Sequence, residues 1–260
     1  MLTFIVIAFC IALAGGIISG VFGGGSGLIY VPGFFYLIHH YNPFASHQMQ
    51  VAIASCVCSS VLLGVVASIK QLKYRQVSLR TLKWFSPLAI VGGAIGISIV
   101  SALSSSSTKL IFALIILMIA IWMWRKRYNS IHVSALSTAF KSTLVILAGM
   151  ATMLSGVSAF FVPSLIKCGL DIKKAIGTST LVTLFISLVM SLLWVLYGLN
   201  VTGLPRYTIG FISYPIVIVS LIPSIIGALI GARLSYVIKQ GKLQVIYISM
   251  MFIIAFIMLT

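Results

Sequence analysis

Negative charge is nearly absent from this chain. Among its 260 residues Asp171 is the only acidic side chain, against 17 Lys and Arg, and charged residues of all kinds make up 7%. No Asp, Glu, Lys or Arg falls in the middle of an apolar segment. A carboxylate relay of the kind found in many proton-driven carriers is therefore excluded. An enzyme is not expected either, because the apolar segments offer no nucleophile with a base and no metal cluster.

Cysteines are few, and their placement excludes a disulfide framework. The four residues Cys10, Cys56, Cys58 and Cys168 lie in or beside apolar runs, which is typical of small, buried, reduced thiols. Cys56 and Cys58 are two residues apart, a spacing that points their thiols to different faces of a helix and argues against a shared metal. We predict neither a metal site nor a cofactor.

Long polar stretches are also missing, which excludes a separate soluble domain. Hydrophobic residues make up 61% of the chain, and apolar runs of about 17 residues or more recur from end to end. These features predict an all-α polytopic membrane protein. The net charge of +16 lies mostly in short loops, where anionic lipid and topology favour basic residues, so no nucleic-acid partner is expected.

The apolar segments form two sets of five, which we interpret as two transmembrane repeats. Residues 1–124 form the first repeat, 125–141 a cytoplasmic linker and 142–260 the second repeat. The predicted segments are 2–22, 28–39, 49–69, 84–102 and 109–124, then 142–157, 159–168, 174–197, 208–234 and 243–259. The second segment of each set is too short to cross a bilayer alone, since about twelve helical residues reach roughly 18 Å. Each is expected to extend into its flanks or to form a broken hairpin, tipped by Gly or Ser, with the segment before it.

Both sets carry the same signals in the same order. A broken apolar pair that ends in Val-Pro occurs at 23–32 and again at 155–163. The run Ala-Ile-Ala-Ser-Cys at 52–56 is matched by Ala-Ile-Gly-Thr-Ser at 175–179, and a Gly-x-x-x-Gly motif follows at 92–96 and at 227–231. Such glycine pairs favour close helix packing. Internal duplication with a break at the same place in each copy is typical of secondary transporters.

The distribution of basic residues predicts the orientation. The loops at 70–83, 125–141, 167–174 and 233–242 hold all Lys and Arg except Lys109 and Arg206. If these loops are cytoplasmic, both termini are extracytoplasmic, and segments 49–69 and 174–197 cross in opposite directions. The two repeats would then be inverted, which is the geometry of alternating access. We expect a multi-pass protein of a bacterial-type plasma membrane.

The two broken segments are the first candidates for a substrate site. Backbone breaks within lipid are costly unless their polar groups face protein, water or a ligand, and a helix start carries unpaired N–H groups that suit an anion. Inversion would bring the two breaks together near the midplane. The alternative is a tight turn or a close helix contact without a ligand. The candidate residues are Gly23, Gly24, Gly25, Ser26 and Gly27 in the first break and Ser155, Gly156 and Ser158 in the second.

The third segment of each repeat supplies further candidates. Small or hydroxyl residues at matched places favour a polar cavity wall, although each hydroxyl can also bond the carbonyl four residues back. The predicted wall residues are Ser55, Cys56 and Ser59 in the first repeat and Gly177, Thr178, Ser179 and Thr180 in the second. His47 and Asp171 are candidates for a gate or proton site. Asp171 also fits a helix N-cap, a purely structural role.

These motifs together resemble a known family. The glycine-rich break ending in Val31-Pro32, the Ala-Ile-Gly-Thr-Ser run at 175–179 and the paired Gly-x-x-x-Gly motifs are similar to the sulfite exporter TauE/SafE family of membrane permeases, in order over essentially the whole chain. The first copy departs from this pattern with Ala54-Ser55-Cys56. The resemblance implies transport of small sulfur-containing or carbon anions, such as sulfite or an organosulfonate.

We therefore predict a secondary transporter of a small anion, with sulfite or an organosulfonate as the preferred substrate. Proton coupling and a uniport driven by membrane potential both remain open, as do the direction and the oligomeric state. The alternative is a membrane-embedded assembly or metal-handling protein without anion flux, which would use Cys56, Cys58 and the histidines of the predicted outer face.

Overall fold

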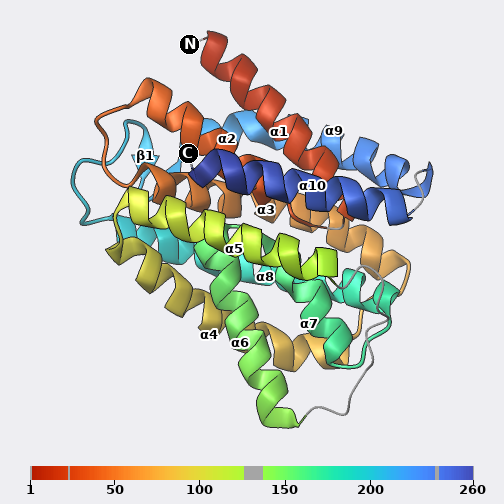
Figure 1. Cartoon of the computed structure of the whole chain (residues 1–260). Helices are drawn as coiled ribbons and strands as arrows, with labels where there is room; N and C mark the ends of the chain where they lie inside the picture. Colours follow the sequence, from red (N-terminus) through yellow and green to blue (C-terminus); the bar gives the residue numbers. More distant parts are fainter. Residues whose placement is uncertain (1, 23, 126–136, 238–239, 260) are drawn as a thin grey trace.

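The computed structural model describes residues 2–22, 24–125, 137–237 and 240–259 (Figure 1). Helices follow one another along the chain, and the short 3-10 helix η1 (Ser158–Phe160) and one small hairpin are the other regular elements of these ranges. The helices are α1 (Leu2–Phe22), α2 (Gly27–Tyr41), α3 (Gln48–Lys73), α4 (Leu79–Ala102), α5 (Ser105–Arg125), α6 (Thr138–Ser155), α7 (Phe161–Lys167), α8 (Ile172–Gly198), α9 (Tyr214–Val237) and α10 (Gln240–Leu259).

Helix lengths and surfaces confirm an all-α polytopic membrane protein. Among the described residues, seven helices are long and apolar enough to cross a membrane: α1, α3, α4, α5, α6, α8 and α9. Large apolar side chains cover their outer faces; Met118 is 62% exposed, Leu192 67% and Ile222 70%. Such surfaces are unfavourable in water, and they suit contact with lipid chains.

The structure differs from the sequence prediction at the start of the segment predicted at 208–234. Thr208–Ile209 (β1) and Ile212–Ser213 (β2) form an antiparallel hairpin, and α9 begins only at Tyr214. Gly210 allows the tight turn between the strands, with a φ of +56°. The two ladder pairs satisfy backbone groups outside a helix, which apolar composition alone does not predict.

Two other boundaries also differ. The fourth segment, predicted from residue 84, begins at Leu79, because the Ser78 side chain accepts a hydrogen bond from the Thr81 N–H at 3.4 Å and caps the helix. The first helix of the second half, predicted from residue 142, begins at Thr138. Residues 126–136 of the linker predicted at 125–141 lie outside the described residues.

The second helix of each half is short, as predicted. α2 has 15 residues and reaches about 22 Å, while α7 has only 7 and follows η1 directly. A break precedes each of them. Gly25 in the first break has a φ of +91° and Gly156 in the second has a φ of +66°, backbone conformations that side chains other than glycine rarely adopt.

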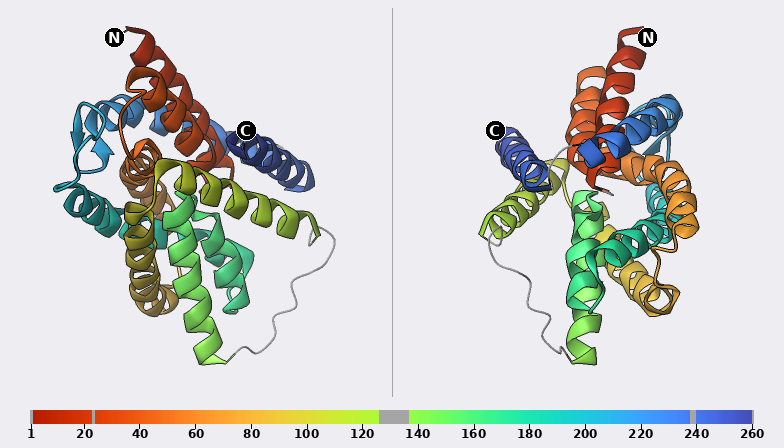
Figure 2. Two further views of the ribbon diagram at one scale, coloured as in Figure 1. Left: turned by 60° about the vertical axis from the view of Figure 1, so that its left-hand side comes forward. Right: turned by 90° about the vertical axis from the view of Figure 1, so that its right-hand side faces the viewer.

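Packing is reciprocal between the two halves of the chain. α1 packs on α9, and α4 packs on α6, so the fourth helix of each half lies on the first helix of the other. α3 packs on α8, and α5 lies beside α10 along one side of the molecule (Figure 2). The halves therefore interleave, and the core includes contacts between the third helices and between the fifth helices of the two halves.

Glycines set the closest helix contacts. A Cβ added at Gly92 would lie 2.0 Å from the Ile146 carbonyl oxygen of α6, and one at Gly227 would lie 2.3 Å from the Leu13 carbonyl oxygen of α1. Gly16 of α1 approaches Ser224 of α9 equally closely. The Gly-x-x-x-Gly motifs at 92–96 and 227–231 are thus confirmed as helix-packing motifs, where dispersion contacts replace the missing hydrophobic driving force.

We expect Gly227→Ala to lower the free energy of unfolding by about 1–3 kcal/mol, because the new methyl group meets a backbone oxygen that cannot move aside. Gly64→Ala is the comparison variant and should cost less, since its Cβ would lie 3.1 Å from the Leu184 Cβ and 3.3 Å from the Leu184 Cα, which a shift of a few tenths of an ångström relieves. Thermal unfolding in detergent, followed by tryptophan fluorescence, measures both. Equal melting temperatures for the two variants would contradict this account of the α1–α9 contact.

Candidate functional site

The two broken segments lie directly against each other. A Cβ added at Gly27 would lie 2.0 Å from the Gly156 carbonyl oxygen, and one at Gly24 would lie 3.1 Å from the Ser158 hydroxyl oxygen. The two breaks therefore meet in the structure, while their predicted place near the midplane stays a prediction. Only glycine at position 27 permits this approach, because any side chain would collide with the opposite backbone.

The start of α2 presents hydrogen-bond donors at this meeting point. Ser26 is its N-cap residue, is 6% exposed, and makes no capping bond through its side chain. Within the described ranges, no group accepts a hydrogen bond from the backbone N–H of Gly25 or of Ser26. Gly23, also predicted for this site, lies outside the described residues. The unpaired N–H groups give this helix start a partial positive charge that suits an anion.

The second break is held partly by its own side chains. The Ser155 hydroxyl donates to the Ala151 carbonyl at 2.8 Å and accepts from the Val157 N–H at 3.3 Å, so Ser155 stabilises the turn. The buried Cys56 thiol of α3 donates to the Gly156 carbonyl at 3.7 Å. The Ser158 hydroxyl has no partner among the described residues.

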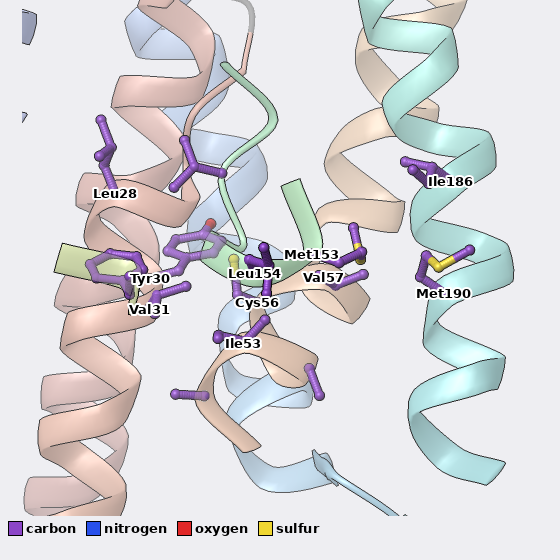
Figure 3. Packing of buried hydrophobic residues seen from close by; sticks show 14 of the residues in the cluster. Leu28, Tyr30, Val31, Ile53, Cys56, Val57, Met153, Leu154, Ile186 and Met190 are labelled. Carbon is purple, nitrogen blue, oxygen red and sulfur yellow. The ribbon is translucent and has the colours of Figure 1, made fainter. Parts of the chain in front are cut away.

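Apolar side chains surround the second break. Figure 3 shows Val31 of α2, Ile53 and Cys56 of α3 and Leu154 of α6 packed close to one another. A Cβ added at Gly156 would lie 2.7 Å from Val31 and 3.6 Å from Ile53. The polar backbone of the breaks is therefore flanked by hydrocarbon, where a hydrogen bond to an anion is stronger than in water.

Ser55 and Thr178 form a matched pair of hydrogen bonds, which we call the hydroxyl clamps. The Ser55 hydroxyl accepts from the Ser213 N–H at 2.9 Å, just before α9, and the Thr178 hydroxyl accepts from the Ser78 N–H at 3.0 Å, just before α4. Both acceptor residues are fully buried. Each clamp joins a third helix to the start of the fourth helix of the other half. Sequence matching pairs Ser55 with Thr178, but it could not reveal these partners.

The remaining predicted wall residues have internal partners. Ser179 and Thr180 both donate to the Ile176 carbonyl, at 2.8 and 2.9 Å, which is local bonding within one helix. Their role in a cavity wall stays a prediction. The Ser59 hydroxyl lies 2.9 Å from that of Ser220 in α9. A Cβ added at Gly177 would lie 2.0 Å from the Gln76 carbonyl oxygen, so the missing side chain lets the loop before α4 pack directly against α8.

The two candidate gate residues lie at helix starts. The Asp171 carboxylate accepts from the Lys174 N–H at 3.2 Å and caps α8, which confirms the N-cap interpretation. His47 precedes α3 with a φ of +56°, and its ring lies 5.7 Å from that of Phe211. Its Nδ1 atom is buried without a partner among the described residues. A gate or proton role for either residue stays a prediction.

All four cysteines are free thiols, but only Cys56 is buried as predicted; Cys58 and Cys168 are half-buried and Cys10 is exposed. Within the described part of the chain, no three His, Cys, Asp or Glu side chains gather in a group that could hold a metal ion. The polar groups at the two breaks are backbone amides, hydroxyls and the Cys56 thiol.

The apolar helices, two of them short and preceded by breaks that meet, define a polytopic α-helical membrane protein. The chain matches the sulfite exporter TauE/SafE family over residues 7–258 and belongs to that family. A curated relative from Haemophilus influenzae, described as "Probable membrane transporter protein", is 25% identical over 249 residues, which cover 93% of this chain and 94% of the relative. No solved structure matches the chain. The family resemblance found in the sequence is thus confirmed, and the protein is a multi-pass membrane transporter.

We expect Ser55→Ala and Thr178→Val each to lower the free energy of unfolding by about 1–3 kcal/mol, because each leaves a buried backbone N–H without an acceptor. Ser60→Ala is the control, since its hydroxyl only donates to the Cys56 carbonyl of the same helix, at 2.8 Å. Thermal unfolding in detergent gives the comparison. If the clamp variants melt at the same temperature as Ser60→Ala, the clamps contribute no stability.

Proposed function

We propose that this protein carries a small anion, sulfite or an organosulfonate, across the plasma membrane by alternating access. The observation that carries the proposal is the contact between the two breaks, with Gly27 against Gly156 and Gly24 against Ser158. Membership of the sulfite exporter TauE/SafE family supports the substrate class.

The polar groups at the breaks favour an anion over a cation. Two backbone N–H groups at the start of α2 and the hydroxyls of Ser26 and Ser158 can all donate hydrogen bonds. The sole acidic residue, Asp171, is exposed and caps α8. Neutral donors on a helix start bind an oxyanion without a fixed counter-ion, and this permits release on the far side.

The arrangement of the third helices supports inverted repeats. Ser46, before α3, donates to the carbonyls of Thr202 and Gly203, which follow α8. At the opposite end, Thr178 near the start of α8 bonds Ser78 beyond the end of α3. α3 and α8 therefore run antiparallel, and α5 and α10 also run in opposite directions in Figure 1. Equivalent helices that run antiparallel are what inversion of repeats 1–124 and 142–260 requires.

The hydroxyl clamps suit alternating access because they lie in equivalent places of the two proposed repeats. The Ser55–Ser213 clamp joins α3 to α9, and the Thr178–Ser78 clamp joins α8 to α4. In the proposed cycle, each clamp opens when its side of the transporter opens. An inside-negative potential expels anions by about 2.3 kcal/mol per charge per 100 mV, so export needs no coupled ion.

We expect purified protein in liposomes to carry sulfite or a short alkyl sulfonate at a rate that rises with an imposed membrane potential. Ser26→Ala and Ser158→Ala should raise the KM several-fold, because each removes a donor from the breaks. Ser164→Ala is the matched control, since its hydroxyl donates to the Phe160 carbonyl at 2.8 Å. Wild-type liposomes without flux of any sulfur oxyanion or sulfonate would refute the proposed substrate class.

The proposed orientation places both termini outside, and cysteine labelling tests it. On a background without native cysteines, the cysteines of Tyr74→Cys and Lys173→Cys should react with a maleimide that crosses the membrane. They should not react with an impermeant maleimide added outside intact cells. Ser106→Cys and Leu199→Cys should react with an impermeant maleimide added outside intact cells. All four positions lie at helix ends. Labelling of positions 74 and 106 from the same face would overturn this orientation.

A further inference from the structure

Tyr247 of α10 lies at the first break, although the sequence marked its segment only as a span. Its hydroxyl oxygen is 2.7 Å from the position that a Gly25 Cβ would occupy, so it lies against the bare backbone of the break. Its ring packs on Phe22, the last residue of α1, with ring centroids 4.3 Å apart. The side chain thus reaches from α10 across the end of α1 to the point where α2 begins.

The Tyr247 hydroxyl has no hydrogen-bond partner among the described residues, although the residue is only 4% exposed. The hydroxyl oxygen is not fully enclosed by protein atoms, so it opens onto a small space that a water molecule or a ligand can reach. Phenylalanine would fill the same position but would offer no hydrogen-bond donor to that space. Tyr30 shows the usual arrangement, because its buried hydroxyl bonds the Ala12 carbonyl at 3.2 Å and the Ser224 hydroxyl. A ligand that accepts a hydrogen bond would account for the hydroxyl at position 247.

We propose that Tyr247 is a substrate-binding residue, whose hydroxyl donates a hydrogen bond to an oxygen of the transported oxyanion at the first break. This inference rests on the proposed function and names a residue for the same site. The Gly25 and Ser26 N–H groups point to the same class of ligand, since all of these groups are donors. A sulfur oxyanion or a sulfonate offers several acceptor oxygens to such a set.

The two breaks differ in whether the last helix of the half supplies a phenol. Matching Lys109-Leu110 with Lys242-Leu243 places Leu114 at the position equivalent to Tyr247, and Leu114 is 50% exposed. The equivalent helix therefore supplies no phenol to the second break. We infer an asymmetric site, in which the oxyanion is held more tightly by the first break than by the second.

The test compares Tyr247→Phe with Tyr30→Phe in liposomes, with sulfite and methanesulfonate as the transported probes. Tyr247→Phe should raise the KM about tenfold to a hundredfold, the cost of one hydrogen bond to a charged ligand, and leave the melting temperature unchanged or higher. Tyr30→Phe should show the reverse, with a lower melting temperature and an unchanged KM, because its hydroxyl bonds the protein itself.

Each outcome is decisive. Wild-type flux together with an unchanged KM in Tyr247→Phe overturns the role of Tyr247 and leaves the proposed function intact. Wild-type liposomes that carry neither probe refute the proposed function, and sulfite binding, followed as a rise in melting temperature, then shows whether the site exists.

Should Tyr247→Phe fail to fold, a fluorotyrosine introduced at position 247 keeps the ring and donates more strongly, so the KM should fall. A KM that stays the same with fluorotyrosine also overturns the proposal.

Discussion

Backbone amides within hydrocarbon must find partners, and the rest of this structure depends on how the two breaks meet that requirement. The chain interrupts its helices at Gly24–Ser26 and again at Gly156–Val157, and it then places the interruptions against each other. Part of the freed backbone is satisfied locally, as at Ser155. The N–H groups at the start of α2 are left without acceptors among the described residues, in a region flanked by apolar side chains.

The interleaving of the two halves makes this meeting possible. Because α9 lies on α1 and α4 lies on α6, neither half closes on itself, and each break is brought to the other half. Glycines at 92 and 227 allow the backbones to approach closely enough for this arrangement. The hydroxyl clamps then fix the start of each fourth helix against the third helix of the opposite half.

The scarcity of charge is consistent with the proposed transport. A fixed cation at the breaks would bind an oxyanion strongly and slow its release, whereas amides and hydroxyls bind through dipoles that can be exchanged for water. The proposed role of Tyr247 extends the same chemistry, because a neutral phenol adds a donor without adding charge. In this proposal the membrane potential supplies the directional energy.

Hydropathy and glycine spacing predicted much of the fold. Apolar runs located every long helix, and glycines at 23–27 and 156 located both breaks, because glycine is a poor helix former and interrupts an otherwise continuous apolar run. Prediction failed at the β1–β2 hairpin and at the start of α4, where the decisive signals were two ladder pairs and the Ser78 cap. Such signals are short and local, so a long apolar run conceals them.

The amino-acid sequence by itself determined that this is a nearly acid-free membrane protein of the sulfite exporter TauE/SafE family, with one break in each half of the chain. Only the tertiary structure decided which polar groups remain free. It assigned Ser55 and Thr178 to the clamps and Ser179 to a local carbonyl, and it placed Tyr247 at Gly25. A hydroxyl looks the same in sequence whether it bonds its own helix, a distant backbone group or nothing, because its partner depends on how the helices pack.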